Sequence, residues 1–159
     1  MRRSAILLVT VIVLATGGFT FAQMAPGHRM PPEMSMSATD DRQAIAVSEP
    51  IRIFVLAEMR GMLASVQGVT EAIARRDWQA AIDSAGKTGL KAFEGMPKPI
   101  LMELPEDFRI MGRETHIAFD EVAKAASATQ DPSAVSAKLA DALQFCVACH
   151  QTYRFTVNK

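Results

Sequence analysis

Two cysteines and a histidine stand close together near the C-terminal end of this chain of 159 residues, in the segment Cys146-Val147-Ala148-Cys149-His150. They include the only two cysteines of the sequence. On a helix, residues three and four positions apart lie on one face, so both thiols and the imidazole would project together. Such a group can bond to the two vinyl groups of a haem and ligate its iron. The pattern C-x-x-C-H is typical of covalent c-type haem attachment.

Three other uses of a cysteine pair compete with this interpretation. A thioredoxin-like redox pair is expected in a βαβ context, and no strand pattern precedes Cys146. A structural zinc site takes four protein ligands, and only His28 and His116 could join the motif. A structural disulfide is the third. The fixed order of three uncommon residues favours haem, attached to Cys146 and Cys149 with His150 as the proximal iron ligand.

The motif belongs to the last of four helices that the pattern of apolar residues predicts. The first begins at Ser48, a typical N-cap, and its apolar residues recur at steps of three and four as far as Ile73. The second is expected to follow Asp77 and to reach about Phe93, although glycines weaken its middle. The proline-rich segment 95–105 is expected to be a loop.

The third helix is expected to begin near Pro105, with acidic residues in its first turn and an apolar stripe from Phe108 onward. The fourth has Asp131 as N-cap and Pro132 at its first position, and its stripe runs through the haem motif to Tyr153. Short connections between long helices make neighbours antiparallel. The sequence therefore predicts an all-α domain, an up-down-up-down four-helix bundle with the haem near the C-terminal end of helix four.

The first 22 residues have the composition of a secretory signal. A basic start is followed by an apolar run from Ala5 to Ala15, and small residues lead to an expected cleavage after Ala22. The run is shorter than the ~20 residues of a membrane-spanning helix, so no integral membrane span is expected after cleavage. Because haem is attached to reduced thiols outside the bacterial cytoplasm, the mature chain is expected in the periplasm.

Residues 23–45 are expected to form a flexible leader before the helical domain at 46–159. Between Gln23 and Gln43 there are three prolines and no aliphatic β-branched residue. Thioether sulfurs suit Cu(I), so copper handling by this leader is one interpretation, with a ligand set of Met24, His28, Met30, Met34 and Met36. Cleavage would remove Arg2 and Arg3 from the 17 basic side chains, which leaves 15 against 17 acidic ones. This balance does not favour nucleic acid or an anionic membrane as a partner.

A haem motif near the C-terminus of four expected helices makes the chain resemble the class II c-type cytochromes, the cytochrome c-prime family. The match runs from Cys146 through Tyr153 and Arg154, which correspond to an aromatic residue and an arginine that follow the haem histidine in that family. The resemblance covers roughly Ser48 to Phe155 and is specific at the motif. It implies a periplasmic haem protein, often dimeric, that carries electrons or binds small gases.

The resemblance also implies a distal residue in the first half of helix one. In low-spin members of the family this residue is a methionine that ligates iron, and in high-spin members it is not a ligand. Met59, about 13 Å into the expected helix at ~1.5 Å per residue, is the candidate. Met62, one turn further, and His116, on the third helix, are alternatives, and an open five-coordinate iron is the remaining possibility.

The ligand set separates two functions. A Met–His pair saturates the iron and stabilises its ferrous state, which suits transfer of single electrons between periplasmic redox proteins. An open iron would instead bind NO or CO. The sequence indicates no acid–base pair near the iron, so an enzyme is not expected. We expect a monohaem c-type electron carrier, with a five-coordinate gas-binding cytochrome as the alternative.

Two residues after the motif are expected to contact the haem from the same helix. Arg154 lies one expected turn beyond His150, where it can pair with a haem propionate or stabilise the negative end of the helix. Tyr153 is expected to pack against the porphyrin, with its hydroxyl near solvent.

Overall fold

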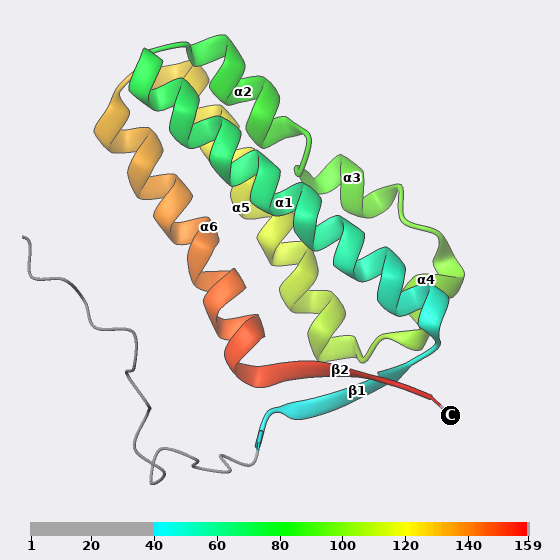
Figure 1. Cartoon of the computed structure of the whole chain (residues 1–159). Coiled ribbons are helices and arrows are strands. Elements are labelled where there is room, and N and C mark those ends of the chain that lie inside the picture. Colours follow the sequence, from blue (N-terminus) through cyan, green and yellow to red (C-terminus); the bar gives the residue numbers. More distant parts are fainter. Residues whose placement is uncertain (1–39, 159) are drawn as a thin grey trace, which may run out of the picture. The chain divides into compact units, whose positions relative to one another are not determined.

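The computed structural model describes residues 40–158 of the chain (Figure 1). The expected signal peptide at 1–22 and residues 23–39 of the expected leader lie outside the described residues. The same holds for every candidate copper ligand named above. Within residues 40–158, no helix is both long and apolar enough to cross a membrane.

Helices make up most of the described chain, as the sequence predicts. In chain order the elements are β1 Gln43–Val47, α1 Glu49–Arg75, α2 Trp78–Gly86, α3 Leu90–Glu94, α4 Lys98–Glu103, α5 Glu106–Thr129, α6 Pro132–Thr152 and β2 Tyr153–Val157.

The helices α1, α2, α5 and α6 begin next to residues that the sequence singles out, Ser48, Asp77, Pro105 and Asp131. α1 follows Ser48 and stops at Arg76, whose left-handed φ of 55° ends the helix. Asp77 caps α2, because its carboxylate accepts the backbone N–H of Ala80 at 3.0 Å. Asp131 caps α6 in the same way. Each carboxylate satisfies N–H groups that a first helical turn leaves without partners.

The second expected helix is broken in two. α2 ends at Gly86, and α3 begins after Gly89, because glycine has a low helix propensity and two of them fall close together. The expected loop at 95–105 contains α4, which has a proline in its first turn, where the missing N–H costs nothing. The sequence predicted that the glycines weaken the second helix, but it did not predict the separate short helices α3 and α4.

The two strands are the main departure from the expected fold. β1 and β2 pair in parallel over their whole lengths, although residues 43–45 were expected in the leader and Tyr153 on the last helix. Instead α6 ends at Thr152. The physical reason lies in alternate apolar residues of β1, since Ile45 and Val47 are 2% and 0% exposed while their neighbours face solvent.

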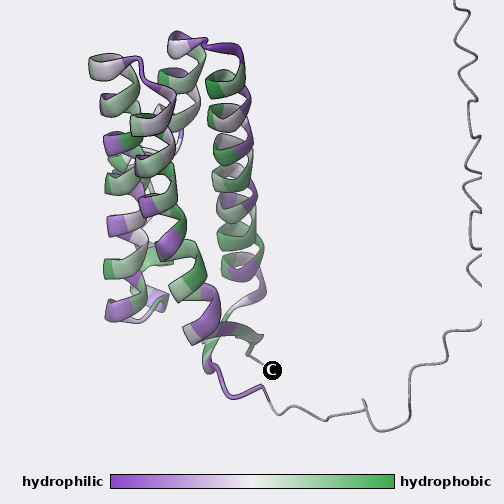
Figure 2. Ribbon diagram, turned by 90° about the vertical axis from the view of Figure 1, so that its left-hand side faces the viewer, coloured by the Kyte–Doolittle hydropathy of each residue, from purple (hydrophilic) through white to green (hydrophobic). Residues whose placement is uncertain are grey.

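The helices enclose two clusters of buried side chains. α5 packs against both α2 and α6, α1 packs against α2, and α5 and α6 run in opposite directions (Figure 1). Hydrophobic and hydrophilic residues follow one another around each helix (Figure 2), as in helices with one buried face. The larger cluster comprises Val69, Ala72, Ala81, Ala85, Phe119, Val122, Ala126, Val135, Leu139 and Ala142. The smaller one, next to the strands, comprises Ile45, Val47, Ile51, Val55, Leu104 and Phe108.

Candidate functional site

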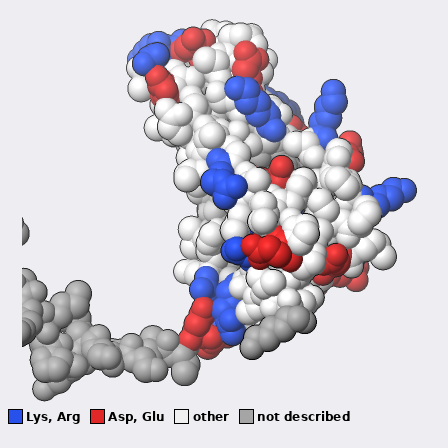
Figure 3. Space-filling model, turned by 45° about the vertical axis from the view of Figure 1, so that its right-hand side comes forward, with Lys and Arg blue, Asp and Glu red and all other residues white. Residues whose placement is uncertain are grey.

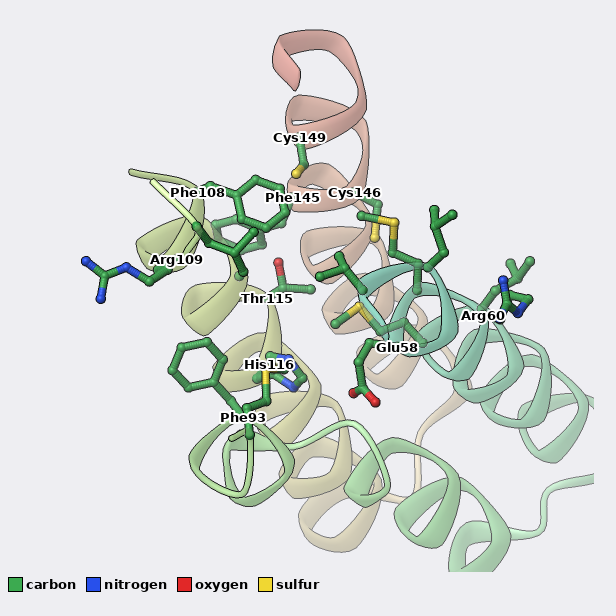
Figure 4. Close-up of a pocket in the computed structure, with 18 of the residues that line it drawn as sticks. Glu58, Arg60, Phe93, Phe108, Arg109, Thr115, His116, Phe145, Cys146 and Cys149 are labelled. Carbon is green, nitrogen blue, oxygen red and sulfur yellow. The ribbon is translucent and has the colours of Figure 1, made fainter. Parts of the chain in front are cut away.

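A cavity of about 500 Å³ lies between α1, α5 and α6 (Figure 4). Its wall consists mainly of aliphatic, aromatic and methionine side chains. The volume falls in the range of ~300–1,000 Å³ in which proteins hold small molecules and cofactors. Six residues singled out from the sequence line this cavity: Met59, Met62, His116, Cys146, Cys149 and His150.

The two cysteines are brought together by the helical spacing of the motif. Both side chains project from α6 toward residues of α1 and α5 (Figure 4), and both are half-buried free thiols. Burial raises the pKa of Cys146, and burial together with the neighbouring Cys146 sulfur raises the pKa of Cys149. At neutral pH the cavity wall therefore presents two protonated thiols one helical turn apart, and each becomes a nucleophile on deprotonation.

His150 lies on the rim of the cavity, in the last turn of α6. Its side chain is exposed, while its backbone carbonyl accepts a hydrogen bond from Arg42 Nη1 at 3.2 Å. The same guanidinium group contacts the carbonyl of Tyr153 at 3.5 Å. A cation at this place satisfies carbonyls that the end of α6 leaves free and stabilises the negative end of the helix.

Arg42 is held in turn by Asp40. Their ion pair is 2.7 Å long, and the hydrogen bonds from Arg42 lower the pKa of Asp40 to about 2. The contact of Arg42 with the carbonyl of His150 was not predicted, since no local pattern links two residues that lie 108 positions apart in the chain.

Tyr153 and Arg154 lie on β2, so their expected placement on the haem helix is wrong. Arg154 donates to the backbone carbonyl of Arg42 at 3.3 Å and lies 3.7 Å from the carboxylate of Asp40. The ring of Tyr153 meets Phe108 edge-on, with centroids 5.5 Å apart. Neither residue lines the cavity, but Phe108 does. Tyr153 therefore supports the cavity wall from behind.

The two candidate methionines line the cavity from α1, and both are half-buried. Met59 packs against the smaller buried cluster, which includes Phe108, and so does Cys149. Met62 lies one turn further along α1, about 4.5 Å at ~1.5 Å per residue, and does not pack against that cluster. Met59 is therefore the thioether that shares a buried cluster with Cys149.

His116 lies at the end of the cavity away from Cys149 (Figure 4). It is 1% exposed, and its Nδ1 is 2.6 Å from the carbonyl oxygen of Thr88. Its Nε2 is buried without a hydrogen-bond partner. The ring packs against Phe93, with centroids 5.5 Å apart. Sequence reasoning named His116 as a possible iron ligand but did not predict its contact with Thr88, which lies 28 residues earlier.

The charges of the described surface are mixed. On the face drawn in Figure 3, acidic and basic side chains lie interspersed, and parts of this face carry neither. This arrangement agrees with the balanced overall composition of 17 basic and 17 acidic residues.

Comparison of the chain with protein-family models, curated proteins and solved structures found no match. The chemistry of the site is therefore argued from its own residues. An apolar wall, two thiols on one helical face and an imidazole at the rim suit a haem bound through its vinyl groups. Within residues 40–158, two buried side-chain nitrogens lack a partner, Arg109 Nε and His116 Nε2. Both residues line this cavity, but the guanidinium group of Arg109 points away from it (Figure 4). Only His116 Nε2 is therefore an unpartnered polar atom of the kind expected in a wall that receives a group with polar substituents.

Proposed function

We propose that this chain is a periplasmic monohaem c-type cytochrome that carries single electrons, with haem bonded to Cys146 and Cys149 and iron bound by His150. The observation that carries the proposal is the placement of the motif. Both thiols open into a largely apolar cavity of about 500 Å³, and the histidine lies at its rim. A C-x-x-C-H pattern on a helix facing solvent or a filled core would not support it.

Haem would supply the one-electron change between ferrous and ferric iron, and the chain's residues hold and surround it. Cys146 and Cys149 would hold one edge of the haem, each through a thioether formed by addition of its S–H across a vinyl group. Leu104 and Phe108 are buried and form part of the apolar wall of the cavity. We propose Met59 as the sixth ligand, because it lines the cavity and packs on the same cluster as Cys149, and a neutral thioether favours the reduced state.

We also propose that the helices form an up-down-up-down four-helix bundle, in which α2 and α3 together supply the second helix. The opposite directions of α5 and α6 (Figure 1) and the packing of α1 on α2 support this arrangement. We retain export to the periplasm, redox proteins as partners and a homodimer as proposals drawn from the sequence.

The test is an absorption spectrum of the protein produced in a host with c-type cytochrome maturation. We expect sharp ferrous haem bands that remain with the polypeptide after denaturation. The matched control replaces both thiols, Cys146→Ser with Cys149→Ser, and is expected to lose covalent haem. Absence of haem bands from the unaltered protein would reject the proposal.

A five-coordinate haem that binds NO or CO is the second candidate function. Leu56 and Leu63, which cannot ligate iron, line the same wall of α1 as the two methionines. An aliphatic side chain opposite His150 would leave the sixth position open. Addition of CO to the ferrous protein separates the two functions, since immediate and complete binding indicates an open iron and resistance indicates a methionine ligand.

A further inference from the structure

His116 is a buried imidazole whose proton arrangement is partly fixed by the fold. A backbone carbonyl only accepts hydrogen bonds, so the contact of 2.6 Å with Thr88 requires a hydrogen on Nδ1. Thr88 is itself 4% exposed, and its hydroxyl lies 2.7 Å from that of Ser65. The ring is therefore held by the α2–α3 connection, which Ser65 links to α1, and its Nε2 is left without a partner in the cavity wall.

The position of His116 along α5 makes the iron an unsuitable partner. Phe108 belongs to the cluster against which Cys149 packs, and His116 follows it by eight residues, about 12 Å at ~1.5 Å per residue. Iron bound by His150 must remain near the level of Cys149, because the two residues are adjacent. His116 instead lies at the opposite end of the cavity (Figure 4).

The opposite edge of a haem carries its two propionates. A haem fixed to Cys146 and Cys149 by its vinyl edge turns these carboxylates toward the end of the cavity away from the thiols. We infer that His116 binds one haem propionate through Nε2. This inference rests on the proposed function. Because Nδ1–H is engaged by Thr88, the pair shares one further proton, carried by Nε2 and donated to the carboxylate.

Three other charged residues are candidate partners of His116 Nε2 or of a propionate. Glu58 is half-buried and, like His116, lines both this cavity and a second one of about 330 Å³, so the test includes its carboxylate as the alternative partner of Nε2. Arg109 has the other unpartnered nitrogen, but its guanidinium group points away from the cavity in Figure 4. Arg154, for which the sequence predicted either a propionate partner or the negative end of the helix, lies beside Asp40 and donates to the backbone of Arg42. The inference is therefore confined to His116.

The test uses resonance Raman spectra of the full-length haem protein, in which propionate bending modes report hydrogen bonding to the carboxylates. His116→Leu is expected to shift one of these modes, and the matched Glu58→Gln variant is expected to leave both in place. His116→Gln, which keeps an N–H donor of similar length, is expected to shift the mode less and serves where His116→Leu does not fold. Propionate modes unchanged in both His116 variants would overturn the inference.

Nitrogen-15 NMR of the ferrous protein provides a second readout. We expect both ring nitrogens of His116 to be protonated in the unaltered protein and in Glu58→Gln. An unprotonated Nε2, or loss of its hydrogen in Glu58→Gln, would overturn the inference and assign Glu58 as the partner in the latter case. A protein without covalent haem would reject the proposed function itself, which distinguishes the two failures.

Discussion

The chemistry proposed for this chain depends on which residues of α1 and α6 face one cavity. Cys146 and Cys149 enter it because their spacing matches a helical turn, and burial raises the pKa of both thiols. Met59 enters it from α1 and packs on the same cluster as Cys149. Met62 lines the same cavity without packing on that cluster, so the two methionines make a matched pair for experiment.

Met59→Leu is expected to convert a low-spin ferric spectrum into a high-spin one and to lower the reduction potential. The substitution removes the sulfur but nearly conserves volume, so its cost in stability is expected to stay below about 1.5 kcal/mol. The absorption spectrum and a redox titration measure the two effects. Met62→Leu is the control and is expected to change neither. An unchanged spectrum in Met59→Leu would reject Met59 as the ligand.

The sequence predicted the residues of this site that obey helical spacing, and it missed those whose partners lie far along the chain. The three residues of the motif were predicted because residues three and four positions apart share a face. The partner of Arg42 lies 108 residues away, and no local pattern reveals such a contact. The role of Thr88 was missed for the same reason, since it lies 28 residues from His116.

At the level of elements, β1 and β2 close the C-terminal end of α6. The strands pair in parallel. Arg42, the residue before β1, donates hydrogen bonds to the carbonyls of His150 and Tyr153. The starts of α2 and α6 were predictable because the caps Asp77 and Asp131 act on residues within one turn. The strands were not, since each has only five residues and its partner lies at the other end of the domain.

Asp40→Asn is expected to lower the midpoint of thermal unfolding at pH 6, because it removes the ion pair that holds Arg42. The pKa of Asp40 is lowered to about 2 from its ordinary value of 3.8. The pair therefore contributes stability above about pH 4, and this contribution is lost as the pH falls through about 2. Melting curves between pH 6 and pH 2 should converge for the two proteins.

Asp41→Asn, which removes the same charge from the adjacent residue, is the control for this prediction. It is expected to shift the midpoint less at pH 6. A difference between Asp40→Asn and the unaltered protein that is constant from pH 6 to pH 2 would contradict the proposed role of the ion pair.

Two glycines of α1 are expected to respond in opposite ways to alanine. At Gly61 an added Cβ meets nothing within 4 Å, so Gly61→Ala should stabilise the protein by about 0.5–1 kcal/mol through helix propensity. At Gly68 a Cβ would lie 2.6 Å from Ser84 Oγ and 3.0 Å from its Cβ, so Ser84 must change rotamer and α1 and α2 must adjust their packing. Denaturant unfolding measures both, and an equal gain at Gly68 would contradict this close packing.

For the whole molecule, stability depends on the larger buried cluster between α1, α2, α5 and α6. Phe119 is 0% exposed there, and Phe119→Ala is expected to lower the free energy of unfolding by about 3–5 kcal/mol. Ile110→Ala, on the same helix but at a side chain 53% exposed, is expected to cost less than about 1 kcal/mol. Denaturant titration of the haem-bound protein compares them, and similar losses would contradict the assigned core.

The central claim is that haem is joined covalently to Cys146 and Cys149. The most direct test is the intact mass of the purified, denatured protein, produced in a host that matures c-type cytochromes. We predict a mass greater than that of the polypeptide by one haem, and loss of this increment when both cysteines are replaced by serine. A mass equal to that of the polypeptide alone would contradict the claim.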